Sequence, residues 1–333
     1  MQRISGEMKQ KAEELLGSGA VSAVLGWKKG DFPYDPSPAF FHSPADLEAL
    51  VYNGFCGGNL SKHLIRQNGE AGKTLVFLKP CDTYSFNQLL CEHHVDREKT
   101  YIVGVGCEGM IDVQKLRDKG ARGIEEVDED GDSLVIRTLY GGQACPREEA
   151  LLEKCLRCKG KEHRIFDERI GEAYSRETTA QDAQDRFSEV SALEGMTPDE
   201  RFAFWRSALS PCIRCNACRA VCPACACRTC VFDSAASGVA SKASADDFEE
   251  NLFHIIRAFH VAGRCTDCGE CSRACPQGIP LHLLNRKLIK DIDGFFGGFQ
   301  AGAEEGLLSP LLSYSREDLE PGAAFQRKGA GSC

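Results

Sequence analysis

The sequence predicts an α/β N-terminal domain followed by a mostly helical ferredoxin-type domain that holds two 4Fe-4S clusters. In the first half, short apolar runs alternate with helix-like segments, which is typical of a parallel α/β sheet. In the second half, the spacing C-x2-C-x2-C-x3-C-P occurs twice, and this is the pattern of bacterial ferredoxins. We expect domains at 1–170 and 196–294, a linking segment at 171–195 and a C-terminal tail at 295–333.

The composition narrows the class of protein. Hydrophobic residues make up 42% and charged residues 27% of the 333 residues, as in globular proteins. The net charge of −9 argues against a nucleic-acid partner, which usually needs a basic face. No run of about 18 apolar residues is present to span a membrane, and the N-terminus lacks the apolar core of a signal peptide. We therefore expect a cytoplasmic protein without a membrane span.

The cysteine content indicates metal or redox chemistry. The chain has 19 cysteines, and in a reducing cytosol such a density points to metal ligation more often than to structural disulfides. So many thiols would be easily oxidised in air, which suggests a role in anaerobic metabolism.

The elements of the first half are expected in the following order. Buried-strand patterns at 73–78 and 99–106 are each followed by a helical pattern, at 83–94 and about 112–119. A further strand, with an antiparallel orientation as one option, is expected at 132–140. Ligands of such sheets bind beyond the carboxyl ends of the strands.

The first of these strand ends carries the motif KPCD, with Lys79, Cys81 and Asp82. We predict that these residues lie near a flavin or a cluster; alternatively, the two charges only stabilise a turn. No G-x-G-x-x-G or G-x4-G-K-[ST] motif is present, so a bound FAD has no sequence motif of its own.

A third 4Fe-4S cluster is a further expectation for this half. The second strand ends at Cys107 in GCEG, close to Cys81 if the strands are neighbours, and more cysteines follow. The candidate ligands are Cys107, Cys145, Cys155 and Cys158. A zinc site or a set of reduced buried cysteines remains an alternative. Cys56, Cys91 and Cys333 have no evident partners.

The two ferredoxin runs predict eight cluster ligands. In two-cluster ferredoxins the fourth cysteine of each run binds the cluster of the other run. The first predicted ligand set is Cys212, Cys215, Cys218 and Cys275. The second is Cys265, Cys268, Cys271 and Cys222. Paired zinc sites are the alternative, although zinc ribbons seldom use this spacing.

Three cysteines near the first run are surplus to these sets. Cys225, Cys227 and Cys230 either form a further metal site or pack as small apolar side chains.

Three helices are expected in the second half. One begins at a capping box at Thr197, one covers an apolar pattern that runs from Phe248 to Phe259, and one covers residues 281–292. That apolar pattern comprises Phe248, Leu252, Ile255, Ile256 and Phe259.

These segments resemble a known family. The run LKPCDTYSFNQLL, the run VDREKTYIVGVGCEGMID, CLRC and the two ferredoxin runs are similar to the deazaflavin-coenzyme hydrogenase/dehydrogenase beta-subunit group, which includes beta subunits of formate dehydrogenases. The C-terminal half is also similar to iron–sulfur subunits that accompany heterodisulfide-reductase-type complexes and to the A subunit of anaerobic sulfite reductase. The resemblance implies electron transfer between clusters and, in some members, a flavin that reduces the deazaflavin.

We therefore expect an electron-transfer subunit that relays electrons between a catalytic partner and a second redox protein. The partner would be a formate dehydrogenase, a hydrogenase or a heterodisulfide-reductase-like flavoprotein. The alternative is a flavoenzyme that oxidises or reduces a nicotinamide or deazaflavin, with the clusters as its electron outlet. A zinc scaffold without redox activity is a third hypothesis. The aromatic residues Phe295, Phe296 and Phe299 of the tail are expected to dock on the ferredoxin module or on a partner.

Overall fold

The computed structural model describes residues 1–67, 71–174, 185–234, 236 and 247–314. Its N-terminal domain is built on a six-stranded mixed sheet in the order β2-β1-β4-β5-β9, with β3 also paired to β1. Strands β1, β4, β5 and β9 are parallel, whereas β2 and β3 run antiparallel to β1. The strands are β1 Ala23–Lys28, β2 Ser37–Phe41, β3 Leu50–Val51, β4 Thr74–Leu78, β5 Thr100–Cys107 and β9 Glu168–Tyr174.

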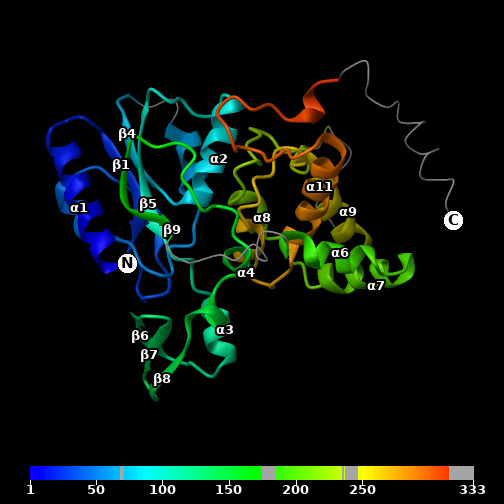
Figure 1. Ribbon diagram of the computed structural model, residues 1–333, viewed down its shortest axis with the longest axis horizontal. Coiled ribbons are helices and arrows are strands. Elements are labelled where there is room, and N and C mark those ends of the chain that lie inside the picture. The colour runs from blue at the N-terminus through cyan, green and yellow to red at the C-terminus, as the bar shows by residue number, and fades with distance from the viewer. Residues whose placement is uncertain (68–70, 175–184, 235, 237–246, 315–333) are drawn as a thin grey trace.

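Helices cover both faces of this sheet. Helix α1 (Gln2–Gly17) lies on one face, and α2 (Pro80–Cys91) lies on the other, next to the 3-10 helix η2 (Leu60–Gln67) (Figure 1). The predicted strands at 73–78 and 99–106 are confirmed as β4 and β5, and the helix after β4 begins at Pro80. Strand β4 is buried at every position because both faces are covered, which is typical of a parallel α/β sheet.

A smaller unit is inserted between β5 and β9. It consists of α3 (Val113–Asp118) and the antiparallel strands β6 (Ile124–Asp130), β7 (Ser133–Thr138) and β8 (Gly141–Pro146), followed by η3 (Arg147–Ala150). Figure 1 shows that this unit projects from the edge of the main sheet, and it has its own apolar core. The predicted antiparallel strand is confirmed as β7, but it belongs to this second sheet.

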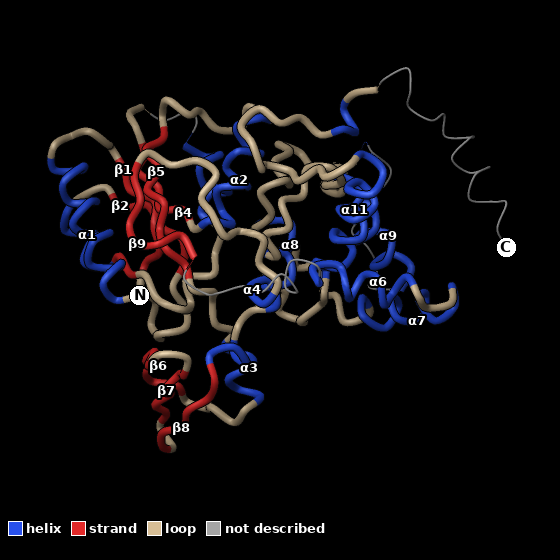
Figure 2. The backbone as a smooth tube through the Cα atoms, viewed as in Figure 1, coloured by secondary structure: helices blue, strands red, loops and turns tan. Residues whose placement is uncertain are grey.

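The second domain packs against the α2 face. Its described elements are η4 (Asp185–Phe187), α6 (Ser188–Glu194), α7 (Pro198–Leu209), α8 (Ala217–Ala220), α9 (Asp247–His260), α10 (Glu270–Arg273) and α11 (Leu281–Phe296). Figure 2 shows these helices separated by long loops. The predicted capping box at Thr197 and Glu200 is confirmed. Part of the predicted linking segment is helical, because α6 packs on α11.

The apolar pattern predicted for α9 does not face the core of the domain. Phe248, Ile255 and Phe259 are 73%, 42% and 64% exposed, and they line an open groove of about 590 Å³ together with Trp205 of α7. The buried face of α9 instead carries Glu250, Phe253, His254 and Arg257. The helix is therefore rotated so that charged and polar side chains, rather than the apolar pattern, face the cysteine loops.

The tail returns to the N-terminal domain rather than to the ferredoxin module alone. The side-chain amide of Asn87 in α2 donates to the carbonyl oxygen of Gly302 at 3.2 Å, and the thiol of Cys91 lies 3.6 Å from the carbonyl oxygen of Leu307. A short 3-10 helix, η6 (Pro310–Leu312), follows. Phe295 and Phe296, at the end of α11, are 65% and 45% exposed.

Two further short elements complete the described structure. They are the 3-10 helix η1 (Pro44–Ala49) and helix α4 (Glu153–Leu156), which holds Cys155. Among the described helices, none has both the length and the apolar character needed to cross a membrane.

Candidate metal centres

The two cysteine runs fold into loops of the same conformation. Arg214 and Asn216 in the first run have φ angles of 51° and 61°, and the equivalent Asp267 and Gly269 have 52° and 67°. Two left-handed residues in each loop turn the chain around its own cysteines. The backbone N–H of Arg214 donates to the sulfur of Cys212 at 3.4 Å, as expected of a loop whose amides point at cluster sulfur. The third cysteine of each run then lies in a short helix, α8 or α10.

The loops approach each other so that the fourth cysteine of each run lies near the other run. Burial raises the pKa of the Cys218 thiol to about 11, and the charges that add to the shift include Cys275 of the second run. Burial likewise raises the pKa of Cys271 to about 11, with Cys222 of the first run among its neighbours. This arrangement is consistent with crossed ligation. We call the two predicted groups set 1 and set 2; the former comprises Cys212, Cys215, Cys218 and Cys275, and the latter Cys222, Cys265, Cys268 and Cys271.

The chemistry of these sets fits metal clusters. Several of the thiols are buried, and burial in the absence of metal favours their protonated form. A bound metal replaces the proton and removes the cost of holding a buried thiol unpaired. Each set offers four soft sulfur ligands, which is the donor set of a 4Fe-4S cluster.

A third group of four thiols lies in the N-terminal domain. Cys107 ends β5, and Cys81 lies in the first turn of α2, directly after the adjacent parallel strand β4. Cys155 and Cys158 approach them from α4 and the loop that follows it. Burial raises the pKa of Cys107 to about 12, with Cys155 next in effect, and burial together with Asp82 and Cys158 raises that of Cys81.

Backbone amides point at three of these sulfurs. The N–H groups of Gly109, Met110 and Gly160 donate to the sulfurs of Cys107, Cys155 and Cys158 at 3.4, 3.3 and 3.3 Å, respectively. We call Cys81, Cys107, Cys155 and Cys158 the N-terminal thiol set. Amide donors around four converging thiols are the same features that characterise the two ferredoxin loops.

Cys145 does not lie with the other predicted ligands of the third cluster. It is on β8, opposite Leu134, and packs against the core of the small sheet. After burial, the groups that influence its pKa are Lys119 and Glu149 rather than other cysteines. Cys81 takes the fourth position instead. The sequence does contain a signal for this choice, because KPCD and GCEG both follow buried strands, and the sheet makes those strands neighbours.

Lys79 and Asp82 form a buried ion pair. Their side chains are each 1% exposed and their charged atoms lie 2.8 Å apart. The ammonium of Lys79 also donates to the carbonyl oxygen of Gly58 at 2.9 Å and lies 4.3 Å from the centre of the Trp27 ring. Burial opposes the charge of Lys79, but Asp82 raises its pKa above the usual value. With both charges already paired and buried, the arrangement favours a structural role over contact with a flavin.

The three surplus cysteines line a cavity of about 640 Å³ between η2, α8, α9 and the loop that contains them. The cavity is rich in positive charge although the chain is acidic overall. Its basic residues are Lys62, Arg66, Arg219, Arg228, Arg257, His260 and Arg264, against the single acid Asp233. Cys225 is half-buried and Cys227 exposed.

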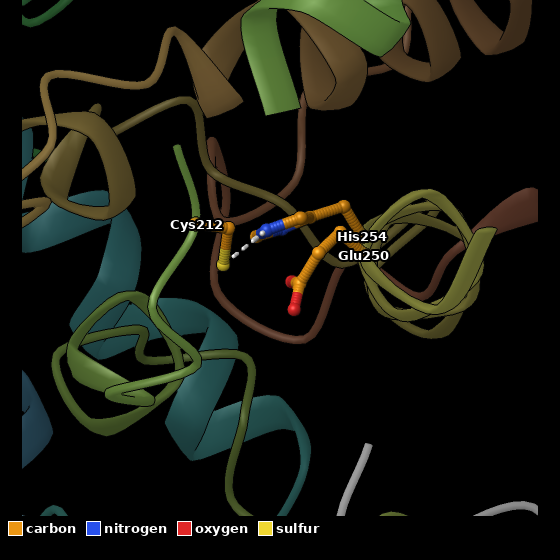
Figure 3. A group of neighbouring side chains, drawn as sticks. All are labelled: Cys212, Glu250 and His254. Atoms are coloured by element: carbon orange, nitrogen blue, oxygen red, sulfur yellow. Dashed lines mark hydrogen bonds between the residues drawn. The ribbon is translucent and has the colours of Figure 1, made fainter. Parts of the chain in front are cut away.

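Two buried side chains of α9 contact set 1. The ring nitrogen Nε2 of His254 lies 3.3 Å from the sulfur of Cys212, and the carboxylate of Glu250 lies beside them (Figure 3). Among the described residues, these three form the only group of three or more His, Cys, Asp and Glu ligand atoms that all lie within 4.8 Å of one another. Burial lowers the pKa of His254 to about 3, so its ring is neutral near pH 7.

A buried charge network joins set 2 to the N-terminal thiol set. Glu270, next to Cys271, pairs with both Lys154 and Arg273, and its oxygen is 2.8 Å from the Arg273 guanidinium. The ammonium of Lys154 also donates to the carbonyl oxygen of Gly57 at 3.0 Å. Although burial opposes ionisation, these two cations hold the pKa of Glu270 well below its usual range. The cysteines whose charges raise the pKa of Lys154 are Cys81 and Cys155.

Comparison with known proteins supports the predicted resemblance. Residues 208–279 match the family model of the 4Fe-4S dicluster domain. The chain is 22% identical to the beta subunit of F420-dependent formate dehydrogenase from Methanocaldococcus jannaschii, over 91% of this chain and 92% of the relative. It is 25% identical to the beta subunit of F420-dependent formate dehydrogenase 1 from Methanococcus maripaludis, over 66% and 71% of the two chains.

A chain of the F420-reducing [NiFe] hydrogenase complex from Methanosarcina barkeri is a structural neighbour, with a TM-score of 0.39 and 12% identity over 62% of this chain and 87% of that chain. At this score the likeness supports no conclusion about fold or function. The sequence matches do confirm the predicted likeness to deazaflavin-dependent beta subunits and the presence of a 4Fe-4S dicluster domain.

Proposed function

We propose that this protein is an iron–sulfur electron-transfer subunit with three 4Fe-4S clusters, held by set 1, set 2 and the N-terminal thiol set. The observation that carries the proposal is the continuity of the three sets. Cysteines of sets 1 and 2 pack in one cluster, and Lys154 pairs with Glu270 of the set 2 loop while lying near Cys81 and Cys155. When bound, the clusters would supply one-electron chemistry, and the chain itself would position them and control their surroundings.

The partner is proposed to be a catalytic oxidoreductase subunit. The curated relatives are named as subunits of F420-dependent formate dehydrogenases, so a formate dehydrogenase subunit is the first choice. A hydrogenase or a heterodisulfide-reductase-like flavoprotein would fit the same role. A relay of this kind exchanges single electrons between such a partner and a second redox protein, and it needs no acid–base residue of its own.

One observation favours a second function, that of a flavin-containing subunit which reduces or oxidises a nicotinamide or deazaflavin. The basic cavity has a volume of about 640 Å³, within the range of small-molecule sites, and its cations could bind the phosphates of FAD. Lys79 and Asp82 do not support this function, because they form a buried ion pair with each other and leave no free charge to bind a ligand.

The test is the content of iron, sulfide and flavin per chain in protein purified without oxygen. Three clusters give about twelve irons, and two give about eight. The variant C81S should lose about four irons, whereas C145S should lose none. If C145S loses iron and C81S does not, the N-terminal thiol set is contradicted. One flavin per chain would favour the flavoenzyme. Zinc without iron would contradict both functions.

A further inference from the structure

Arg257 is a buried cation without a protein partner. Its side chain lies on the buried face of α9, one turn beyond His254, and the residue is 3% exposed. None of its three guanidinium nitrogens has a hydrogen-bond partner among the described residues. A buried charge without a partner is costly, so an unpaired buried guanidinium indicates that the native protein supplies a compensating negative charge there.

The groups that surround Arg257 are cysteines of both ferredoxin ligand sets, together with the surplus Cys225, which lines the same cavity. Burial opposes its charge, but Cys271 and Cys222 of set 2 and Cys218 of set 1 raise its pKa above the usual value. Viewed from the thiols, Arg257 has the largest effect that opposes burial on the pKa of both Cys218 and Cys271. The guanidinium is therefore close to cysteines of both ligand sets.

Two other arginines of the same cavity are already neutralised by carboxylates. Arg264 binds Glu92 through two nitrogens at 2.6 and 2.5 Å, and Arg219 pairs with Asp233 at 2.9 Å. Arg257 has no such counter-ion, and its burial removes it from screening by solvent. Its full charge is thus available to whatever the two ligand sets bind.

Electrostatics determines what that charge does. A 4Fe-4S cluster with four thiolate ligands is an anion, and reduction adds one more negative charge. In a protein interior of low effective dielectric, a nearby cation stabilises the reduced form more than the oxidised form. The same cation also weakens the repulsion between two reduced clusters.

We propose that Arg257 sets the potentials of the relay: its guanidinium raises the reduction potentials of the set 1 and set 2 clusters together and allows both to be reduced in one molecule. The inference rests on the proposed function, because it needs clusters at both sets. Arg257 touches neither a substrate nor a catalytic partner, so it is not a catalytic residue.

The experiment is an anaerobic potentiometric titration followed by electron paramagnetic resonance, on full-length protein of known iron content. In R257Q both midpoint potentials should shift to more negative values, and the signal from molecules with two reduced clusters should decrease. R257K, which retains a cation, should shift less. The matched control is R228Q, which removes an exposed arginine from the same cavity and should leave both potentials unchanged.

Equal midpoint potentials in R257Q and the wild type, at full iron content, would overturn the inference. Should R257Q lose iron, R257M preserves the apolar stem and takes its place. Loss of iron from both neutral variants, with full retention in R257K, would assign Arg257 to cluster assembly and would also overturn the potential-setting role. Wild-type protein without iron at sets 1 and 2 is a different result, because it refutes the proposed function itself.

Discussion

The two regions of this molecule gather cysteines in opposite ways. In the ferredoxin module, three ligands of each predicted set fall within seven residues, and a loop with two left-handed residues wraps them. In the N-terminal domain, the four thiols span residues 81–158: the parallel neighbours β4 and β5 bring Cys81 and Cys107 together, and α4 with its following loop adds Cys155 and Cys158. Local chain geometry builds the first kind of site, and sheet topology builds the second. The first is therefore readable from spacing, whereas the second requires the fold.

The largest expected effect tests whether the two ferredoxin runs exchange their fourth cysteines, that is, which cysteines share a cluster. If the ligation is crossed, C222S and C268S damage the same cluster, so the double variant should lose about four irons, no more than either single variant. The double variant C222S/C215S should lose about eight. The measurement is iron and sulfide per chain after anaerobic purification.

Uncrossed ligation predicts the reverse result. The pair C222S/C215S would then lose about four irons and the pair C222S/C268S about eight. Because each double variant is compared with its own single variants, a general loss of stability would appear as iron loss in both pairs and would be recognised.

The next largest effect concerns the network that joins the two regions. Glu270 is 1% exposed and pairs with Lys154 and Arg273, so E270Q leaves two cations without their carboxylate in a buried place. Removal of one partner from a buried charge pair costs about 3–5 kcal/mol. We expect that loss in the free energy of unfolding, measured by denaturant titration with circular dichroism under anaerobic conditions.

The control for this variant is E149Q. Glu149 pairs with Lys119, but both side chains are largely exposed, at 53% and 38%. Exposed pairs contribute only about 0–1 kcal/mol. Equal effects of E270Q and E149Q would mean that the Glu270 network does not hold the regions together.

Much of the N-terminal fold was predictable because its strands are short apolar runs separated by helical patterns. The expected strands at 73–78 and 99–106 are β4 and β5, and the helix predicted after each was found. Burial of α2 between the sheet and the second domain was not predictable from its sequence, since Thr83, Ser85 and Asn87 are polar and nevertheless buried. Their hydrogen bonds to distant segments compensate for that burial.

The candidate sites show where sequence reasoning ended. The eight ferredoxin cysteines are predicted from spacing alone, whereas one predicted member of the third set, Cys145, lies on β8 away from the other three. Only strand pairing shows that the chain between β5 and β9 first leaves the sheet to form the β6–β8 unit, which carries Cys145 away. The orientation of α9 could likewise not be predicted from its apolar pattern. The periodicity of its sequence predicts an apolar face, but the buried side of α9 towards the cysteine loops carries Glu250, His254 and Arg257.

On the N-terminal side, the pH dependence of stability tests the burial of His163. His163 lies between the ends of β4 and β5, where its Nε2–H group is within 3.2 and 3.1 Å of the carbonyl oxygens of Leu78 and Val105. Burial lowers its pKa to about 4 from 6.5. The unfolded state therefore binds a proton more readily, and the stability contributed by the neutral ring is full above pH 6.5 and is lost as the pH falls towards 4.

The expected size is about 3 kcal/mol, from the fall of the His163 pKa from 6.5 to about 4. H163Q keeps a side-chain N–H donor but cannot titrate, so the difference in unfolding free energy between wild type and H163Q should diminish between pH 6.5 and 4. The exposed His93 provides the control H93Q, which should preserve the wild-type pH dependence. A difference that is constant with pH would contradict a buried neutral His163.

The smallest expected effects come from exchanging residues between the two equivalent loops. Asn216 and Gly269 occupy the same left-handed position, but their surroundings differ. A Cβ atom at Gly269 would lie 2.5 Å from Cβ of Lys154, whereas Asn216 already carries one. N216G should therefore change the unfolding free energy by a few tenths of a kcal/mol, whereas G269N should cost about 1–3 kcal/mol through overpacking.

The difference between N216G and G269N measures how far the N-terminal domain constrains the module. Asn tolerates the left-handed region, so backbone strain does not explain a large cost of G269N. The remaining cause is the approach of Lys154, which belongs to the network beside the N-terminal thiol set. Iron release to a chelator, followed for both variants, should be faster only for G269N. Equal rates would mean that the second loop is as independent of the N-terminal domain as the first, and that the two regions hold their cysteines separately.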